Sequence, residues 1–106
     1  YNVNMTNKIL QKEEVPTLTI DTFLEKNNIV PTMIKMDVEG AEVQAIEGGK
    51  SVIKSNAPKM FVAAYHYDVD VFRLPLLLWE LVPEYKIFFR KHPYIPAWEL
   101  NFLIRK

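Results

Sequence analysis

Four side chains in this sequence could act as acids, bases or ligands. Three of them lie within six residues of one another, and the fourth directly follows the next apolar run of the chain. They are Asp37, Glu39, Glu42 and His66. Carboxylates accept hydrogen bonds from amino and hydroxyl groups, and they bind divalent cations. Imidazole is the side chain whose ordinary pKa lies near neutral pH, which suits it to general-base catalysis. Together these groups could orient a substrate, take a proton from it or hold a cation.

The apolar runs before these side chains predict how they are positioned. Residues 32–38 form an apolar run that ends in the acidic cluster, turns at Gly40 and continues as an amphipathic helix that uses Val43 and Ile46 as its inward face. Residues 60–65 form a second apolar run, which ends at His66. We interpret the runs as central, buried parallel strands. Because the carboxyl ends of parallel strands meet at one edge of a sheet, Asp37 and His66 are expected to share a cleft.

Structural roles for the same side chains stay open at this point. Asp37 and Glu39 could cap the helix that follows them, since carboxylates accept hydrogen bonds from free N–H groups and interact favourably with a helix N-terminus. Glu42 could be an ordinary acid of the first helical turn. His66 could be a hydrogen-bonded structural histidine, and only its expected neighbour Asp37 favours a functional role.

The remaining elements complete an α/β pattern. Thr19 is expected to cap a helix that ends near Asn27. Asp68 and Asp70 supply acids to the start of a helix that runs to Leu81, and Pro75 should kink that helix or restart it. Residues 85–90 and 100–104 should form an antiparallel pair at the sheet edge. The predicted order is helix, strand, helix, strand, helix, strand, strand.

Composition limits the classes of function. The chain has 106 residues with 49% hydrophobic content, enough for one domain or part of one. Thirteen basic and thirteen acidic residues leave no net charge, so nucleic acid and anionic membranes are not expected partners. Cysteine is absent, which excludes disulfides and thiolate chemistry. No signal peptide or membrane-spanning apolar run is apparent, so a cytoplasmic location is expected.

Several segments carry a family resemblance. Residues 17–24 (TLTIDTFL) and 34–42 (IKMDVEGAE), with Gly48 after them, resemble the C-terminal half of the S-adenosylmethionine-dependent methyltransferases of the FkbM family. Residues 15–106 carry the match, and its most specific part is Lys-x-Asp-Val-Glu-Gly-Ala-Glu. Weaker matches follow in the family's order, at Tyr65, His66, Asp70, Pro75, Tyr85, Arg90, His92, Trp98 and Glu99.

The resemblance implies a Rossmann-like class I methyltransferase fold, in which parallel strands with helices on both faces end in an antiparallel hairpin. Residues 15–106 would be the C-terminal half of the domain, and residues 1–14 would be a segment that continues from an upstream half and could form a strand. The family's glycine-rich cofactor loop is not in this chain, because Gly40, Gly48 and Gly49 form no Gly-x-Gly turn. These residues alone should therefore be inactive.

The resemblance also implies site roles and partners. Asp37 and His66 would be catalytic, and Asp37 and Glu39 would contact S-adenosylmethionine. The acceptor would be a small molecule, such as a metabolite or sugar with a reactive hydroxyl. Asp37, Glu39 and His66 could also bind a divalent metal, as in metal-dependent enzymes of the same broad fold, although nothing else in the sequence supports a metal. The exposed sheet edge of a half domain could mediate a homodimer. The alternative is a non-catalytic α/β interaction module.

Overall fold

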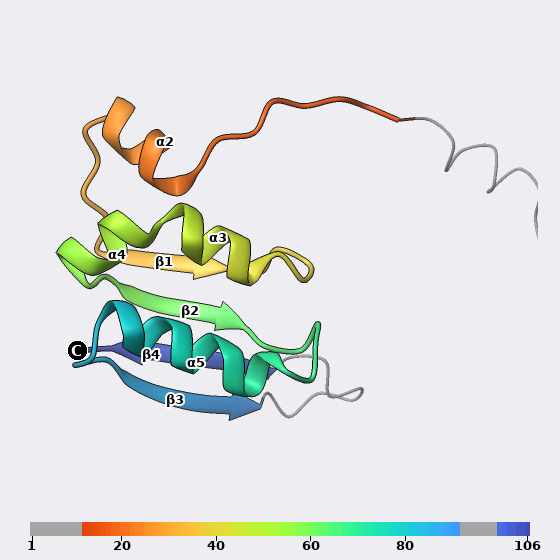
Figure 1. Ribbon diagram of the computed structural model, residues 1–106, viewed down its shortest axis with the longest axis vertical. Coiled ribbons are helices and arrows are strands. Elements are labelled where there is room, and N and C mark those ends of the chain that lie inside the picture. The colour runs from red at the N-terminus through yellow and green to blue at the C-terminus, as the bar shows by residue number, and fades with distance from the viewer. Residues whose placement is uncertain (1–11, 92–99) are drawn as a thin grey trace, which may run out of the picture.

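A four-stranded sheet forms the centre of the computed structural model, which describes residues 12–91 and 100–106 (Figure 1). The first two strands run parallel, and the strand that is last in the sequence runs antiparallel to both of its neighbours. In spatial order the strands are β1 (Met33–Met36), β2 (Lys59–Ala63), β4 (Leu100–Arg105) and β3 (Lys86–Lys91).

The parallel and antiparallel strand pairs both confirm the predicted α/β fold class. Met36 of β1 lies opposite Val62 of β2 in the parallel pair. Phe102 of β4 lies opposite Val62 on one side and Phe89 of β3 on the other. Of the two strands predicted to pair at the sheet edge, only β3 lies at an edge. Its partner β4 is internal, between β2 and β3. The fold positions the carboxyl ends of β1 and β2 beside each other.

The helices cover one face of this sheet. Figure 1 shows α3 (Glu42–Gly48), α4 (Lys50–Asn56) and α5 (Asp70–Leu81) in front of the strands. Side chains from these helices meet the inward side chains of the strands in one buried cluster. Its members are Met36, Ile46, Ile53, Met60, Val62, Ala64, Leu74, Leu78, Val82, Tyr85, Phe102 and Ile104. No helix packs against the other face of the sheet among the described residues (Figure 1).

The first described helix, α2 (Ile20–Lys26), is tied to α4 through its acidic side chain. Thr19 caps α2 as predicted, since its Oγ1 accepts a hydrogen bond from the N–H of Thr22 at 3.1 Å. Asp21 accepts hydrogen bonds from the N–H groups of Ser51 and Val52, each at 3.0 Å. These N–H groups belong to the first turn of α4 and have no partner within that helix. Asp21 thus caps a helix about thirty residues further along the chain.

Helix α5 rules out one of the two forms expected at Pro75 and corrects the expected caps. It runs through Pro75 without a new start, and Pro75 is buried. The capping residue is Val69, which makes no side-chain cap, so Asp68 and Asp70 do not cap the helix. Asp70 instead lies inside the first turn, almost wholly buried, and its Oδ1 accepts a hydrogen bond from Nη2 of Arg73 at 2.6 Å. The carboxylate of Asp70 therefore binds the guanidinium group of Arg73 and does not accept a capping hydrogen bond from the helix N-terminus.

The strands are shorter than the apolar runs that predicted them. Residues 32–38 contribute only Met33–Met36 to β1, and residues 60–65 form β2 together with Lys59 but without their last two members. Strand β1 pairs only with β2 among the described residues, and Met33 is 59% exposed, so the central, fully buried position expected for it is not observed. In a strand that is covered on one face only, buried and exposed side chains alternate. This alternation is not visible in the sequence when apolar residues occupy the exposed positions as well.

Tyr85 anchors the segment that leads from α5 into β3. Its hydroxyl donates a hydrogen bond to the carbonyl of Pro58 at 2.6 Å, and its own carbonyl accepts one from Nε1 of Trp79 at 2.9 Å. Burial raises the pKa of Tyr85 from 10.0 to about 12, because the phenolate form would lose its hydration. The hydroxyl therefore stays protonated and keeps donating at neutral pH.

Some sequence predictions lie outside the described residues. The possible strand in residues 1–14 falls mostly on residues 1–11, and residues 12–14 belong to no helix or strand. His92, Trp98 and Glu99 also lie outside the described ranges. Within those ranges, no helix is both long and apolar enough to cross a membrane. The cytoplasmic location stays a prediction.

Candidate functional site

The loop after β1 turns sharply through two residues with left-handed backbone. Glu39 has φ of 53° and Gly40 has φ of 96°. A side chain at Gly40 would overlap the ring of Tyr67, since an added Cβ would lie 2.8 Å from Cε2 of that ring. Left-handed backbone is costly for residues with a Cβ and cheap for glycine. The loop therefore requires Gly40, and the turn directs Asp37 and Glu39 towards the end of β2.

Glu42 closes this loop from inside the protein. It is the first residue of α3 and is fully buried, and its Oε1 accepts a hydrogen bond from the N–H of Val38 at 3.0 Å. Its other oxygen, Oε2, is buried and has no hydrogen-bond partner. A buried carboxylate with an unsatisfied oxygen is costly unless a cation or a donor approaches it. The first-turn position was expected, but the burial was not.

His66 lies among carboxylates at the end of β2. Its Nε2 lies 3.2 Å from Oε2 of Glu39 and 3.7 Å from Oδ1 of Asp37, while its Nδ1 lies 3.2 Å from Oε1 of Glu42. The imidazole is 11% exposed, whereas the side chain of Asp37 is 43% exposed and that of Glu39 is 83% exposed. Buried and accessible acids thus lie on opposite sides of one ring.

Tyr65 holds Asp37 in this arrangement. Its hydroxyl lies 3.0 Å from each carboxylate oxygen of Asp37 and donates its hydrogen bond there. The ring of Tyr65 packs against the ring of His66, with centroids 4.2 Å apart. Sequence reasoning did not assign Tyr65 a site role. The available signal was its place beside His66 at the end of an apolar run, where side chains from neighbouring strands meet.

The structure brings the predicted site residues together. Asp37 and His66 follow adjacent parallel strands and approach each other as expected from the strand order. The capping interpretation of Asp37 and Glu39 is not observed, because α3 is capped by Ala41 without a side-chain hydrogen bond. The catalytic and cofactor-binding roles of these side chains remain predictions.

The donor set of the cluster could serve proton transfer or cation binding. Asp37, Glu42 and His66 each offer one ligand atom, and these atoms lie within 4.8 Å of one another. Nitrogen and carboxylate oxygen atoms at such spacing can share one divalent ion. The group differs from the metal set considered from the sequence, because buried Glu42 takes the place of exposed Glu39. Without an ion, the same arrangement orients an imidazole between carboxylates.

Comparisons with known proteins agree on one family. A family model described as the methyltransferase FkbM domain matches residues 4–96. The crystal structure of methyltransferase FkbM from Methylobacillus flagellatus KT is similar to this chain, with a TM-score of 0.68 and 33% sequence identity. That similarity covers 72% of this chain and 20% of the chain from Methylobacillus, so this chain spans about a fifth of the length of that protein. No curated protein matches the chain.

Proposed function

Because this chain belongs to the FkbM methyltransferase family, we propose that it takes part in S-adenosylmethionine-dependent methyl transfer to a hydroxyl group of a small metabolite or sugar. In this proposal the reaction is carried out by a longer polypeptide, and the chain contributes the C-terminal half of the methyl-transferring domain. Two observations support the longer polypeptide. The chain spans only a fifth of its structural relative, and its three glycines form no Gly-x-Gly turn.

The observation that carries the proposal is the contact between the ends of β1 and β2. Asp37 and His66 come from different strands, yet Oδ1 and Nε2 lie 3.7 Å apart. Tyr65 fixes the carboxylate of Asp37, and Glu42 lies against the opposite nitrogen of His66. A base, an orienting acid and an accessible acid are thus assembled at the sheet edge where α/β proteins bind their ligands.

The accessible carboxylates fit the polar groups of the proposed cofactor. Asp37 and Glu39 are exposed enough to accept hydrogen bonds from an ammonium or a hydroxyl group, both of which S-adenosylmethionine carries. When bound, the cofactor supplies a methyl group on a positively charged sulfur. The role of Asp37 and Glu39 would be to hold the cofactor in line with the acceptor.

His66 would act as the general base. In the structure Nε2 is hydrogen-bonded to the exposed carboxylate of Glu39 at 3.2 Å, so the acceptor hydroxyl would have to replace Glu39 there while Nδ1 carries the ring proton. The hydroxyl would then lose its proton to Nε2 as its oxygen takes the methyl group that the cofactor's sulfur would release. Oε1 of Glu42 lies 3.2 Å from Nδ1, for which the described residues provide no hydrogen-bond partner, and its negative charge would stabilise the protonated ring. Asp37 would stabilise the positive ring that results, because its Oδ1 lies on the side of Nε2.

A divalent cation is a second way in which the same residues could act. The unpartnered, buried Oε2 of Glu42 favours it, since an ion shared with Asp37 and His66 would compensate that charge. These residues would hold the ion, which would supply positive charge beside the acceptor oxygen. Titration of Mg²⁺ or Mn²⁺ into the protein by calorimetry would reveal this site, and Glu42→Gln should abolish the binding.

A non-catalytic α/β module is the alternative from another class. Such a module would keep the sheet and lose cofactor binding, and its site residues would serve only structure. The clustering of an imidazole with three carboxylates favours the enzyme, because a purely structural surface gains little from gathering like charges.

The decisive experiment titrates S-adenosylmethionine into the full-length polypeptide and follows release of S-adenosylhomocysteine with a panel of hydroxylated acceptors. His66→Gln should lower turnover roughly 100- to 10,000-fold, the usual contribution of a general base. Asp37→Asn should weaken cofactor binding. Asp68→Asn is the matched control, because Asp68 is exposed and outside the cluster.

The outcomes separate the proposals. Cofactor binding with turnover that depends on His66 and Asp37 supports the mechanism. Normal turnover in both variants would remove the assigned roles while leaving the activity in place. A full-length protein that binds no cofactor would support the interaction module instead.

A further inference from the structure

The outward side of α5 carries a line of exposed apolar side chains, here called the outer stripe. Its members are Val69, Phe72, Leu76 and Trp79, which are 57%, 72%, 64% and 43% exposed. Spacings of three and four positions place them along one side of the helix. A groove of about 490 Å³ runs beside the first three of them. Leu74, on the opposite side of α5, is fully buried in the core. Because α5 is apolar on both sides, it is suited to contact a further element.

The rest of a methyltransferase domain is not expected to cover the outer stripe. Figure 1 shows α5 in front of β4, and β1 lies at the far edge of the sheet. An upstream half would add strands beside β1 and helices on the bare face, which is the sheet face opposite α3, α4 and α5. Both additions lie away from the outward side of α5, which already belongs to an outer layer. A partner for the outer stripe is therefore a separate molecule.

Two side chains of opposite charge border the outer stripe. Arg73 and Glu80 are exposed and seven positions apart, which places them on the same side of α5. Nε and Nη2 of Arg73 donate hydrogen bonds to Oδ1 of Asp70 at 3.2 Å and 2.6 Å. These bonds fix the guanidinium group, and Nη1 makes no hydrogen bond among the described residues. Glu80 takes part in no ion pair within residues 12–91 and 100–106. The border thus offers a spare donor and an unpaired carboxylate.

The order of these side chains fits a second copy of the same helix. In two antiparallel helices related by a two-fold axis, a residue before the axis faces the residue equally far beyond it in the other copy. With the axis at Leu76, Phe72 comes opposite Trp79 of the second copy, and Arg73 comes opposite its Glu80. Both matches hold to within one residue, or about 1.5 Å along the helix, which side chains can span. Leu76 faces its own counterpart at the centre.

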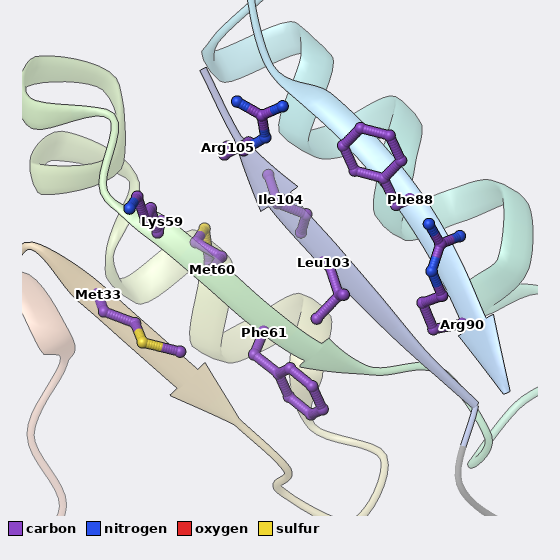
Figure 2. A pocket seen from close by; sticks show the side chains of 9 residues that line it. All are labelled: Met33, Lys59, Met60, Phe61, Phe88, Arg90, Leu103, Ile104 and Arg105. Atoms are coloured by element: carbon purple, nitrogen blue, oxygen red, sulfur yellow. The ribbon is translucent and has the colours of Figure 1, made fainter. Parts of the chain in front are cut away.

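Other arrangements of the exposed apolar surfaces fit less well. A parallel pair of α5 helices would set Arg73 against Arg73 and Glu80 against Glu80, which is unfavourable. The bare face holds Lys59, Arg90 and Arg105 around its apolar side chains (Figure 2), and none of the residues that line the hollow there is acidic. Two copies of that face would therefore repel each other.

We propose that the outer stripe is a homodimer interface, in which α5 packs antiparallel against α5 of a second copy about a two-fold axis at Leu76. The twelve residues of α5 span about 18 Å, so the contact lies at or below the small end of the roughly 1,200–2,000 Å² that stable interfaces bury. A dissociation constant of about 10–100 μM is expected. This surface differs from the sheet edge, where a homodimer was predicted from the sequence. It includes none of the candidate site residues, so the inference goes beyond the proposed function.

Sedimentation equilibrium of the 106-residue chain should show monomers and dimers in exchange. Phe72→Ser should raise the dissociation constant at least about tenfold, because an exposed ring leaves the interface. Phe88→Ser, the same change on the bare face, is the control and should leave it unchanged. Glu80→Arg should raise it about tenfold by placing a second cation beside Arg73 at both ends, and added salt should reduce this effect. Glu25→Arg on exposed α2 is the matched control.

Cysteine cross-linking tests the position of the axis, since the chain has no cysteine of its own. Leu76→Cys should form a disulfide-linked dimer under mild oxidation, because the axis brings its two copies together. Val69→Cys is the matched control, exposed on the same stripe but seven positions from the axis. Its two copies would lie about 21 Å apart, too far for a disulfide.

Four outcomes would overturn the inference. The first is a chain that stays monomeric up to about 1 mM. A dimer that survives Phe72→Ser and is lost in Phe88→Ser would assign the association to the bare face. Equal cross-linking of Val69→Cys and Leu76→Cys would exclude the antiparallel arrangement. Binding of monomers to phosphatidylcholine vesicles, lost in Phe72→Ser, would assign the stripe to a membrane. None of these measurements depends on methyl transfer, so the cofactor titration judges the proposed function separately.

Discussion

Replacing Gly40 by alanine tests the backbone that shapes the candidate site. Gly40 has φ of 96°, where a residue with a Cβ costs about 1–2 kcal/mol. The new methyl group would also lie 2.8 Å from the ring of Tyr67. Tyr67 is 52% exposed, so its ring can move away at modest cost. We expect Gly40→Ala to lower the free energy of unfolding by about 2 kcal/mol in total, most of it from the backbone.

The matched control is Gly48, a glycine in the helix that follows the loop. Gly48 ends α3 and has ordinary backbone, and an added Cβ there would lie 3.4 Å from Cβ of Thr19. Gly48→Ala gains up to about 1 kcal/mol of helix propensity, which offsets that tight contact. Equilibrium urea unfolding followed by circular dichroism gives both free energies. The two alanine variants should differ by roughly 2 kcal/mol in the stated direction.

A double variant separates the two causes. If Tyr67→Ala in the Gly40→Ala background restores little stability, the left-handed backbone is responsible, as we expect. Full restoration would show that overlap with the ring is the cause and that the backbone at Gly40 is adaptable. A Gly40→Ala protein as stable as Gly48→Ala would refute the reasoning altogether, because the turn that brings Asp37 and Glu39 to His66 would then not need a glycine.

Two further predictions concern the anchors of the fold. Tyr85→Phe should cost about 1–3 kcal/mol near neutral pH, because the buried carbonyl of Pro58 loses its donor. Folding raises the pKa of Tyr85 from 10.0 to about 12, so the stability that this group contributes is complete below pH 10 and is lost as the pH rises towards 12. Urea midpoints measured across this range should fall less steeply in Tyr85→Phe, whereas Tyr67→Phe should keep the wild-type fall. Asp21→Ala should lower the free energy of unfolding by about 1 kcal/mol because α4 loses its cap, whereas Glu25→Ala on the exposed side of α2 should be nearly neutral. Equal effects of the two variants in urea unfolding would show that Asp21 does not stabilise α4 as a cap.

The sequence predicted the elements whose evidence is local. Apolar runs before Asp37 and His66 indicated the parallel pair, and the order of elements led to the adjacency of those two side chains. Thr19 indicated the start of α2 because a cap acts within one turn. The family resemblance extended this local evidence to a fold class, which the comparisons confirm.

The remaining features depend on contacts between distant segments. An antiparallel pair is recognisable locally, but its pattern does not say which member lies beside β2, so the internal position of β4 could not be predicted. Glu42 resembles any first-turn acid, and its burial follows from packing against His66 and the loop at Val38. Asp21 acts on residues about thirty positions away, beyond any periodic signal.

The internal position of β4 also affects how the chain folds during its synthesis. Strand β3 hydrogen-bonds only to β4 among the described strands, and β2 has β4 as its second neighbour. During synthesis, neither can complete its ladder until residues 100–105 have left the ribosome. Until then the nascent chain would expose unpaired backbone on β2 and β3, a state vulnerable to aggregation. Residues 100–105 would thus join β2 and β3 into one sheet, and removing them should leave these two strands without a shared neighbour.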